Sequence, residues 1–294
     1  MTIDQDRGAA ASPPQGDRIL MSAFENMNAT APFLQELSRL QEVMALLEYA
    51  LTCASQVDPR ALFANEVGAL SGLVRAYQGL QAAANLAVLG FYTEARAVIR
   101  GVYESAGLAQ MLAHDAELAE GWFRKAMWVP DRQSREFAAA MAGGDEDAKI
   151  PHRQYYKYAS ASAHPSAMTT LPYLLDSDGS INIKLYPSFN HEQFVGLANE
   201  LTAEAIFVGY CLRNALSHPD ALPPEWHKSL AQHAREFSGE PMKHLDDDWV
   251  ERERQHEAIQ QHVRPVEEIN DFLRAHPNSI DNVRSRGYEA DAGV

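Results

Sequence analysis

Apolar residues recur at intervals of three and four along most of the chain, which is the spacing of amphipathic α-helices. The first clear run extends from Pro32 to about Ala54. Asp58-Pro59 then supplies a cap and a first-turn proline for a helix expected to reach Leu89 and to stop at Gly90. Further helices are predicted at 92–114, 116–128, 131–142, 150–163, 191–216 and, in a more charged region, within 223–275. The pattern predicts an all-α, multi-helix bundle.

Three segments depart from this pattern. Residues 1–17 and 277–294 lack periodicity and are expected to be loose tails. Residues 171–190 contain an Asp-Ser-Asp-Gly turn between apolar and β-branched residues, which predicts a small β-hairpin or an extended excursion. The expected organisation is a helical-bundle domain over 18–222, followed by a charged helical extension over 223–276.

Composition and charge narrow the function classes. The 294 residues are 46% hydrophobic and 22% charged, which is ordinary for a globular protein. The net charge of -15 opposes non-specific nucleic-acid binding, so an RNA-binding role requires a local basic cleft. The two distant cysteines are read as reduced thiols, and no Cys-x-x-Cys pair exists for a thiolate zinc site. With no signal peptide and no long uncharged apolar run, the expectation is a soluble, cytoplasmic protein without a membrane span.

The region 90–105 carries a polar stripe on an otherwise apolar helix. Arg96, Arg100 and Glu104 are four residues apart and drift by only about 40° per step, so they share one face. A solvated ladder of ion pairs, worth a few tenths of a kcal/mol per pair, is one interpretation. The apolar residues around the stripe favour another, in which it faces a buried polar cavity.

A second row of polar residues precedes a proline. His152, Tyr156, Ser160 and His164 are again four apart, and Pro165 ends the helix directly after His164. The helix dipole at that position favours the protonated imidazole. The row offers hydrogen bonds and a group that titrates near neutral pH. A histidine that merely caps exposed carbonyls is the alternative.

These two rows carry a resemblance. Residues 72–168 resemble a bacterial helical family of unknown function, with a G-[FY]-x-x-E-A-x-x-x-x-R-x-x-x-E helix followed by S-x-x-x-H-P-S. The matching residues are Gly90, Phe91, Glu94, Ala95, Arg100, Glu104, Tyr156, Ser160, His164, Pro165 and Ser166. The resemblance implies a helical bundle and no established reaction.

The segment RNALSH at 213–218 resembles the Arg-polar-x-x-x-His motif of HEPN ribonucleases, helical-bundle nucleases often found in toxins and phage defence. The resemblance implies metal-independent RNA cleavage without a cofactor. His218 would be the general acid and base, Arg213 would stabilise the phosphorane charge, and Asn214 would hold the phosphate. One feature departs from the motif: Pro219 breaks the helix directly after His218. A regular helix would also place Arg213 and His218 about 140° apart around its axis. For the side chains of Arg213 and His218 to meet at one site, the helix end must be irregular or a second subunit must contribute, as in a homodimer.

Three functions remain open. The first is a HEPN-like ribonuclease or toxin acting on RNA through a buried Arg/Glu/Tyr/His cluster or through RNALSH. The second is a non-catalytic helical module that binds a ligand or a partner. The third is a metal-dependent enzyme using Glu104 and His164.

The candidate site residues belong to the two rows and to RNALSH. The catalytic candidates are His164, Arg100, Glu104, Tyr156, His218 and Arg213, and the binding candidates are Arg96, Ser160, Asn214 and His152. A ribonuclease requires the cations Arg96, Arg100, Arg153, Lys157 and Arg213 to cluster in space. Cations that are scattered or paired with carboxylates would favour the binding module.

Overall fold

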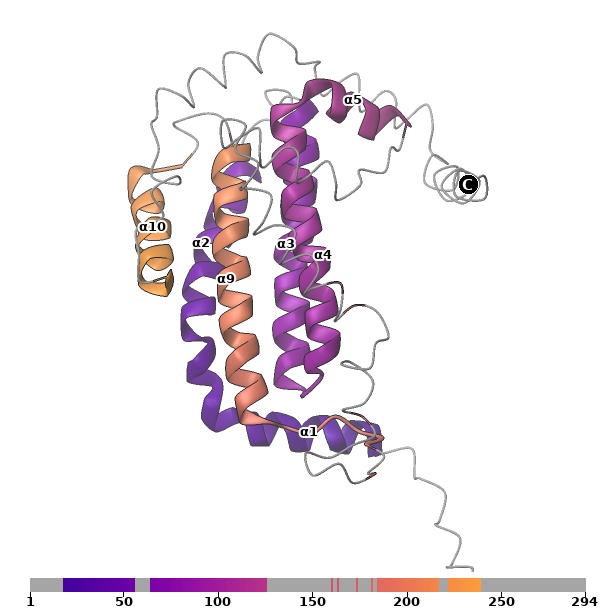
Figure 1. Cartoon of the computed structure of the whole chain (residues 1–294). Coiled ribbons are helices and arrows are strands. Elements are labelled where there is room, and N and C mark those ends of the chain that lie inside the picture. The colour runs from indigo at the N-terminus through magenta and orange to yellow at the C-terminus, as the bar shows by residue number, and fades with distance from the viewer. Residues whose placement is uncertain are drawn as a thin grey trace, which may run out of the picture.

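The computed structural model describes residues 18–55, 64–125, 184–216 and 222–238, with single positions at Ser160, Ala163, Tyr173 and Ile181. Its elements are α1 (Arg18–Thr30), the 3-10 helix η1 (Ala31–Leu37), α2 (Ser38–Ser55), α3 (Ala64–Val88), α4 (Tyr92–His114), α5 (Ala116–Lys125), α9 (His191–Ala215) and α10 (Pro224–Ser238) (Figure 1). These ranges contain helices packed together and no β-strand. The predicted all-α, multi-helix bundle is confirmed.

The turn between α3 and α4 makes these helices an antiparallel hairpin. Gly90 has a φ of 82°, a conformation in which a side chain would be strained. The N–H of Gly90 donates to the carbonyl of Ala87, and the N–H of Phe91 donates to that of Leu86. This is the Schellman arrangement that ends a helix at a glycine. The predicted stop at Gly90 is confirmed.

The helices α4 and α9 run parallel, although 76 residues separate the end of one from the start of the other. Near their starts, the N–H of Asn190 donates to the hydroxyl oxygen of Tyr92 at 2.9 Å. Near their ends, Cys211 Sγ donates to Gln110 Oε1 at 3.6 Å. Both helices therefore end at the same end of the bundle, the upper end in Figure 1.

The hydrophobic core lies among α2, α3, α4, α9 and α10. Its largest fully buried side chains are Phe194, Leu47, Leu73, Leu80, Leu112, Leu197, Leu201, Leu212 and Leu230. The helix α10 is held against α2 by the indole of Trp226, which donates to the carbonyl of Leu46 at 2.8 Å. Within the residues described, α9 is the one helix long and apolar enough to cross a membrane, but 67% of its apolar window is buried inside the bundle. A helix buried in a protein core can have the same length and apolar composition as a membrane span.

Several predicted helix bounds agree with the structure. The helix predicted at 92–114 occupies those residues, and the one predicted at 191–216 ends one residue earlier. The helix predicted from Pro32 begins as the 3-10 helix η1 before α2 continues it. The helix α1 was not predicted as an element. The helices predicted at 131–142 and 150–163, both tails, and most of 223–275 lie outside the described residues.

Part of the predicted excursion at 171–190 is described. The N–H of Lys184 donates to the carbonyl of Tyr173 at 2.9 Å, so the two sides of the Asp-Ser-Asp-Gly turn meet in a backbone hydrogen bond. Residues 184–190 then lead into α9 without helix. Whether the whole segment forms a hairpin stays a prediction, because most of it is outside the described ranges.

Candidate functional site

Arg96 links the two parallel helices. Its Nη2 lies 2.9 Å from Glu200 Oε1, and its Nε donates to both carboxylate oxygens of that residue, at 3.1 and 3.0 Å. Both side chains are half-buried between α4 and α9. The two-pronged contact fixes the orientation of the guanidinium and balances its charge. Arg96, predicted to bind a ligand, is thus engaged with a carboxylate of α9.

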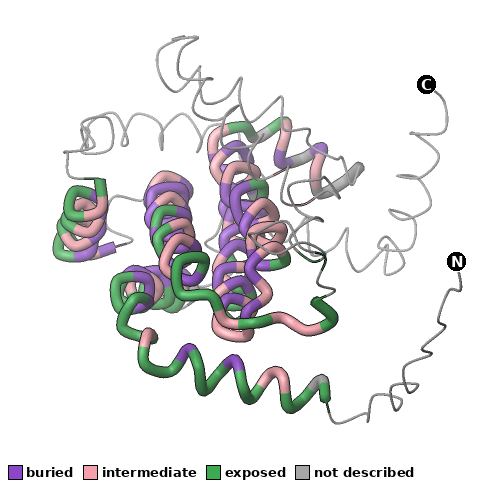
Figure 2. Tube along the Cα trace, turned by 60° about the horizontal axis from the view of Figure 1, so that its bottom comes forward, coloured by how far each residue is buried: buried purple, intermediate pink, exposed green. Residues whose placement is uncertain are grey.

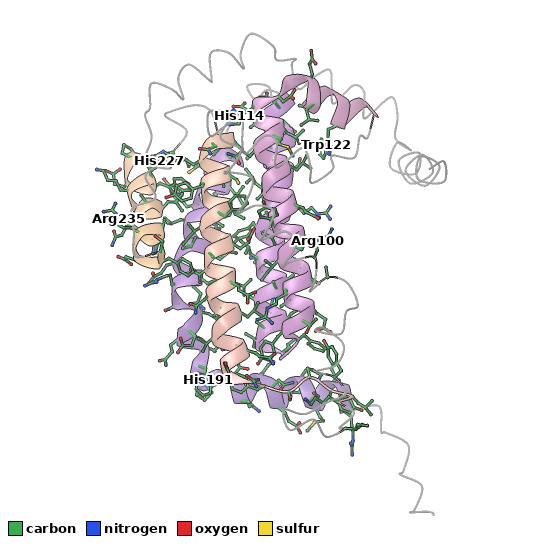
Figure 3. The ribbon with its side chains drawn as sticks, in the orientation of Figure 1. Arg100, His114, Trp122, His191, His227 and Arg235 are labelled. Atoms are coloured by element: carbon green, nitrogen blue, oxygen red, sulfur yellow. The ribbon has the colours of Figure 1, made fainter. Side chains whose placement is uncertain are left out.

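Arg100 pairs within its own helix. Its Nε donates to Glu104 Oε1 at 2.9 Å, and the Glu104 side chain is 44% exposed. Figure 3 shows Arg100 on the outer side of α4, directed away from α9. The pair is thus the ion pair within one helix that four-residue spacing allows, with the Arg100 side chain only 20% exposed. Whether the stripe also faces a buried polar cavity stays a prediction, because most of the helix expected opposite it lies outside the described residues.

The other predicted members of that cluster are only partly described. Ser160 is helical and half-buried. His152, Tyr156 and His164 lie outside the described residues. Their approach to Arg100 and Glu104 therefore stays a prediction.

The helix α9 contributes two acidic residues that the sequence analysis missed. Glu200 pairs with Arg96, and Glu204, one turn later, is only 3% exposed in an otherwise apolar stretch. Their four-residue spacing within an apolar helix was the available signal, since a carboxylate there is seldom buried without a specific role or partner. Arg96 and Glu200 thus make a polar contact between α4 and α9, and Glu204 lies one turn further along α9 on the same side as Glu200.

Arg213 lies in the last turn of α9 and is only 9% exposed. Its guanidinium carbon lies 4.9 Å from the centre of the Tyr210 ring. A cation is favoured there because the partial negative charge at a helix C-terminus and the face of the ring both attract it. Asn214 follows it and is half-buried. His218 lies outside the described residues.

Polar residues from three helices gather at this end of the bundle. Asn65, in the first turn of α3, donates from Nδ2 to the carbonyl of Ala113 at 2.8 Å. Glu66 beside it is buried. His114 ends α4 one turn after Gln110, and Figure 3 shows it at the upper end, where α9 also ends. Neither Asn65 nor His114 was a sequence candidate, because only the parallel register of α4 and α9 brings their ends together.

Metal ligation finds no support in the part of the chain that the structure describes. No group of three or more His, Cys, Asp or Glu side chains is arranged there to hold an ion. Glu104, a proposed ligand of the metal-dependent hypothesis, is paired with Arg100, and its suggested partner His164 is not described.

Cys211 provides a test of the interior around Glu204. Burial, and then the negative charge of Glu204, raise the pKa of the Cys211 thiol well above its ordinary value. We expect thiol reagents at pH 8 to modify Cys53, which is partly exposed, and to leave Cys211 intact until denaturant is added. Equal native rates for the two cysteines would contradict this burial.

The same shift sets a dependence of stability on pH. The folded state keeps the Cys211 proton at a pH where the unfolded thiol ionises. This contribution to the free energy of unfolding is complete below about pH 8.5 and is lost as the pH rises towards the folded pKa. In Cys211→Ala, the decline of stability above pH 8.5 should be shallower in urea titrations. An identical decline would show that another group causes it.

Comparison of the chain with protein-family models, with curated proteins and with solved structures finds no match.

Proposed function

We propose that the protein is a HEPN-like, metal-independent ribonuclease whose site lies at the C-terminal end of α9, around Arg213, Asn214 and His218. The observation that carries the proposal is the buried cation in the last turn of an apolar core helix, with its guanidinium against the Tyr210 ring. Removing a guanidinium from water is costly. A cation already desolvated and oriented stabilises developing phosphorane charge without reorganising during the reaction.

The proposed reaction uses the RNA's own nucleophile. His218 accepts the proton of a ribose 2′-hydroxyl as its oxygen bonds to the adjacent phosphorus, and the bond from phosphorus to the 5′-oxygen breaks. The protonated imidazole of His218 then donates its proton to the leaving 5′-oxygen. The products are a 2′,3′-cyclic phosphate and a 5′-hydroxyl. Arg213 balances the charge on the pentacoordinate phosphorus, and Asn214 positions a non-bridging oxygen.

The α4 face supports this chemistry less well than the end of α9. Arg96 and Arg100 each pair with a carboxylate at 2.9 Å, so their charge is balanced within the protein. Arg153 and Lys157 lie outside the described residues. The proposal instead uses Arg213, which is buried at the end of α9 against the Tyr210 ring.

The ion pairs of Arg96 and Arg100 favour a second candidate function. A non-catalytic module that binds a ligand or a partner requires no free cation on α4. The net charge of -15 is also easier to reconcile with such a module than with general affinity for RNA.

The test is incubation of the purified full chain with total RNA, with and without a chelator. The ribonuclease proposal expects cleavage that resists the chelator and leaves 2′,3′-cyclic phosphate ends. An intact RNA population would contradict the ribonuclease and favour the binding module. Cleavage abolished by the chelator would favour the metal-dependent enzyme instead.

A further inference from the structure

The helix α1 turns its polar side towards the protein. Asn26 Nδ2 donates to the carbonyl of Pro187 at 2.9 Å, and Thr30 Oγ1 lies 3.0 Å from the carbonyl oxygen of Val88. Both polar side chains are buried. These contacts attach α1 to the lower end of the bundle, across the ends of the other helices (Figure 1).

The apolar side of α1 faces outward. Leu20, Met21, Phe24 and Met27 are between 47% and 65% exposed. On a helix of 3.6 residues per turn they fall within an arc of about 120°, opposite Asn26. Figure 2 shows α1 as a largely exposed helix set apart from the core helices. An amphipathic helix normally buries such a stripe, so this orientation leaves an apolar surface that needs a cover.

The area of this surface suits a modest protein interface. Four large apolar side chains at this exposure present on the order of 100 Å² each. With the flanking atoms, two such faces would bury roughly 1,000 Å², close to the lower limit for a specific interface. A micromolar rather than a nanomolar association fits that size.

We propose that a second copy of the chain covers this surface, with the two α1 helices packed antiparallel about a twofold axis. Two identical faces meet across such an axis, so the stripe must match itself when reversed. It does, because Phe24 lies near its middle, with Leu20 and Met21 on one side and Met27 on the other. Phe24 then packs against Phe24 of the partner subunit, and Leu20 against Met27 of the partner subunit.

The charges favour a second copy over a lipid surface. The only charged residues of α1 are Arg18 and Glu25, and neither lies within the apolar arc. A helix that binds a membrane surface usually presents several basic residues beside its apolar face, whereas α1 has one, Arg18, at its N-terminal end. A second copy of the same apolar face needs no such basic residues.

This interface is separate from the proposed ribonuclease site. The helix α1 packs near Val88 and Pro187, at the end of the bundle where α9 begins, whereas Arg213 lies where α9 ends. Dimerisation through α1 leaves the RNALSH end uncovered, and the proposal does not depend on any activity.

Sedimentation equilibrium of the full chain tests the interface. We expect a monomer–dimer equilibrium in the micromolar range. Phe24→Glu should raise the dissociation constant by about 30-fold or more, since it places a charge at the centre of the interface. Val74→Glu is the matched control, because Val74 on α3 is also an exposed apolar residue. Its dissociation constant should match that of the unmodified chain, and both variants should retain their helical circular dichroism.

Cross-linking tests the geometry directly. In a Cys53→Ser background, Phe24→Cys should form a disulfide-linked dimer under mild oxidation, because residues on the twofold axis approach within disulfide range. Val74→Cys should not. A chain that stays monomeric at high micromolar concentration overturns the proposal, as does a dimer unaffected by Phe24→Glu. A monomer that instead binds phosphatidylcholine vesicles through α1 also overturns it, in favour of a lipid surface.

Discussion

His218→Ala is expected to lower the rate of chelator-resistant RNA cleavage by about 10²–10⁴-fold, the usual contribution of a positioned general acid or base. The loss should appear in kcat more than in KM, because the imidazole acts on the proton in transit and not on bound RNA. His164→Ala is the matched control, since it removes the histidine of the other predicted site. Cleavage retained in His218→Ala and lost in His164→Ala would move the site to the helix that carries Ser160.

Arg213 is expected to contribute in the same assay through charge. Arg213→Met keeps most of the apolar stem that packs in the last turn of α9, but removes the guanidinium beside Tyr210. We expect kcat to fall by about 10²–10³-fold, as when a preorganised electrostatic group is removed. Arg96→Met separates this effect from stability, because it breaks the Glu200 pair and leaves the end of α9 unchanged. Equal loss of kcat in both variants would indicate a structural role for Arg213.

Gly72→Ala is expected to destabilise the bundle, although alanine is normally the better helix former. A Cβ at residue 72 would lie 2.8 Å from the carbonyl oxygen of Ser105 and 3.0 Å from Ala109 Cβ. The Ser105 carbonyl belongs to the backbone of α4 and cannot rotate away as a flexible side chain would. The added methyl group therefore forces α3 and α4 apart. The expected loss in free energy of unfolding is about 1–3 kcal/mol, the range for an overpacked core.

Gly101→Ala is the control for this prediction. It lies in the interior of α4, and a Cβ there meets nothing within 4 Å. Relief of the glycine entropy cost should stabilise this variant by about 0.5–1 kcal/mol. Urea unfolding followed by circular dichroism measures both variants. If Gly72→Ala proved as stable as Gly101→Ala, the close approach of α3 and α4 would be refuted.

Much of the helical framework followed from local pattern. The helix over 92–114 was predicted at both ends, because its apolar spacing starts just after Gly90 and glycine accommodates the positive φ that ends the preceding helix. The polar stripe of Arg96, Arg100 and Glu104 was also identified. Helical periodicity is a local property, and so these features are readable from neighbouring residues.

The sequence did not identify the partners of that stripe. Arg96 pairs with Glu200, which is 104 residues away, while Arg100 pairs within its helix. The choice depends on the parallel register of α4 and α9, and no local pattern contains that register. The grouping of Asn65 and His114 with Arg213 at one end of the bundle was missed for the same reason.

For α1, the amphipathic spacing of Leu20, Phe24 and Met27 is present in the sequence, but the direction of its apolar face is not. Spacing determines which residues share a side. Hydrogen bonds from Asn26 and Thr30 to carbonyl oxygens of distant segments decide which side turns inward. The sequence alone therefore determined that this is an all-helical protein, with two histidine motifs and a charged stripe. Only the packing of the helices decided which charges are paired and which surfaces remain exposed, because those depend on contacts between residues far apart in the chain.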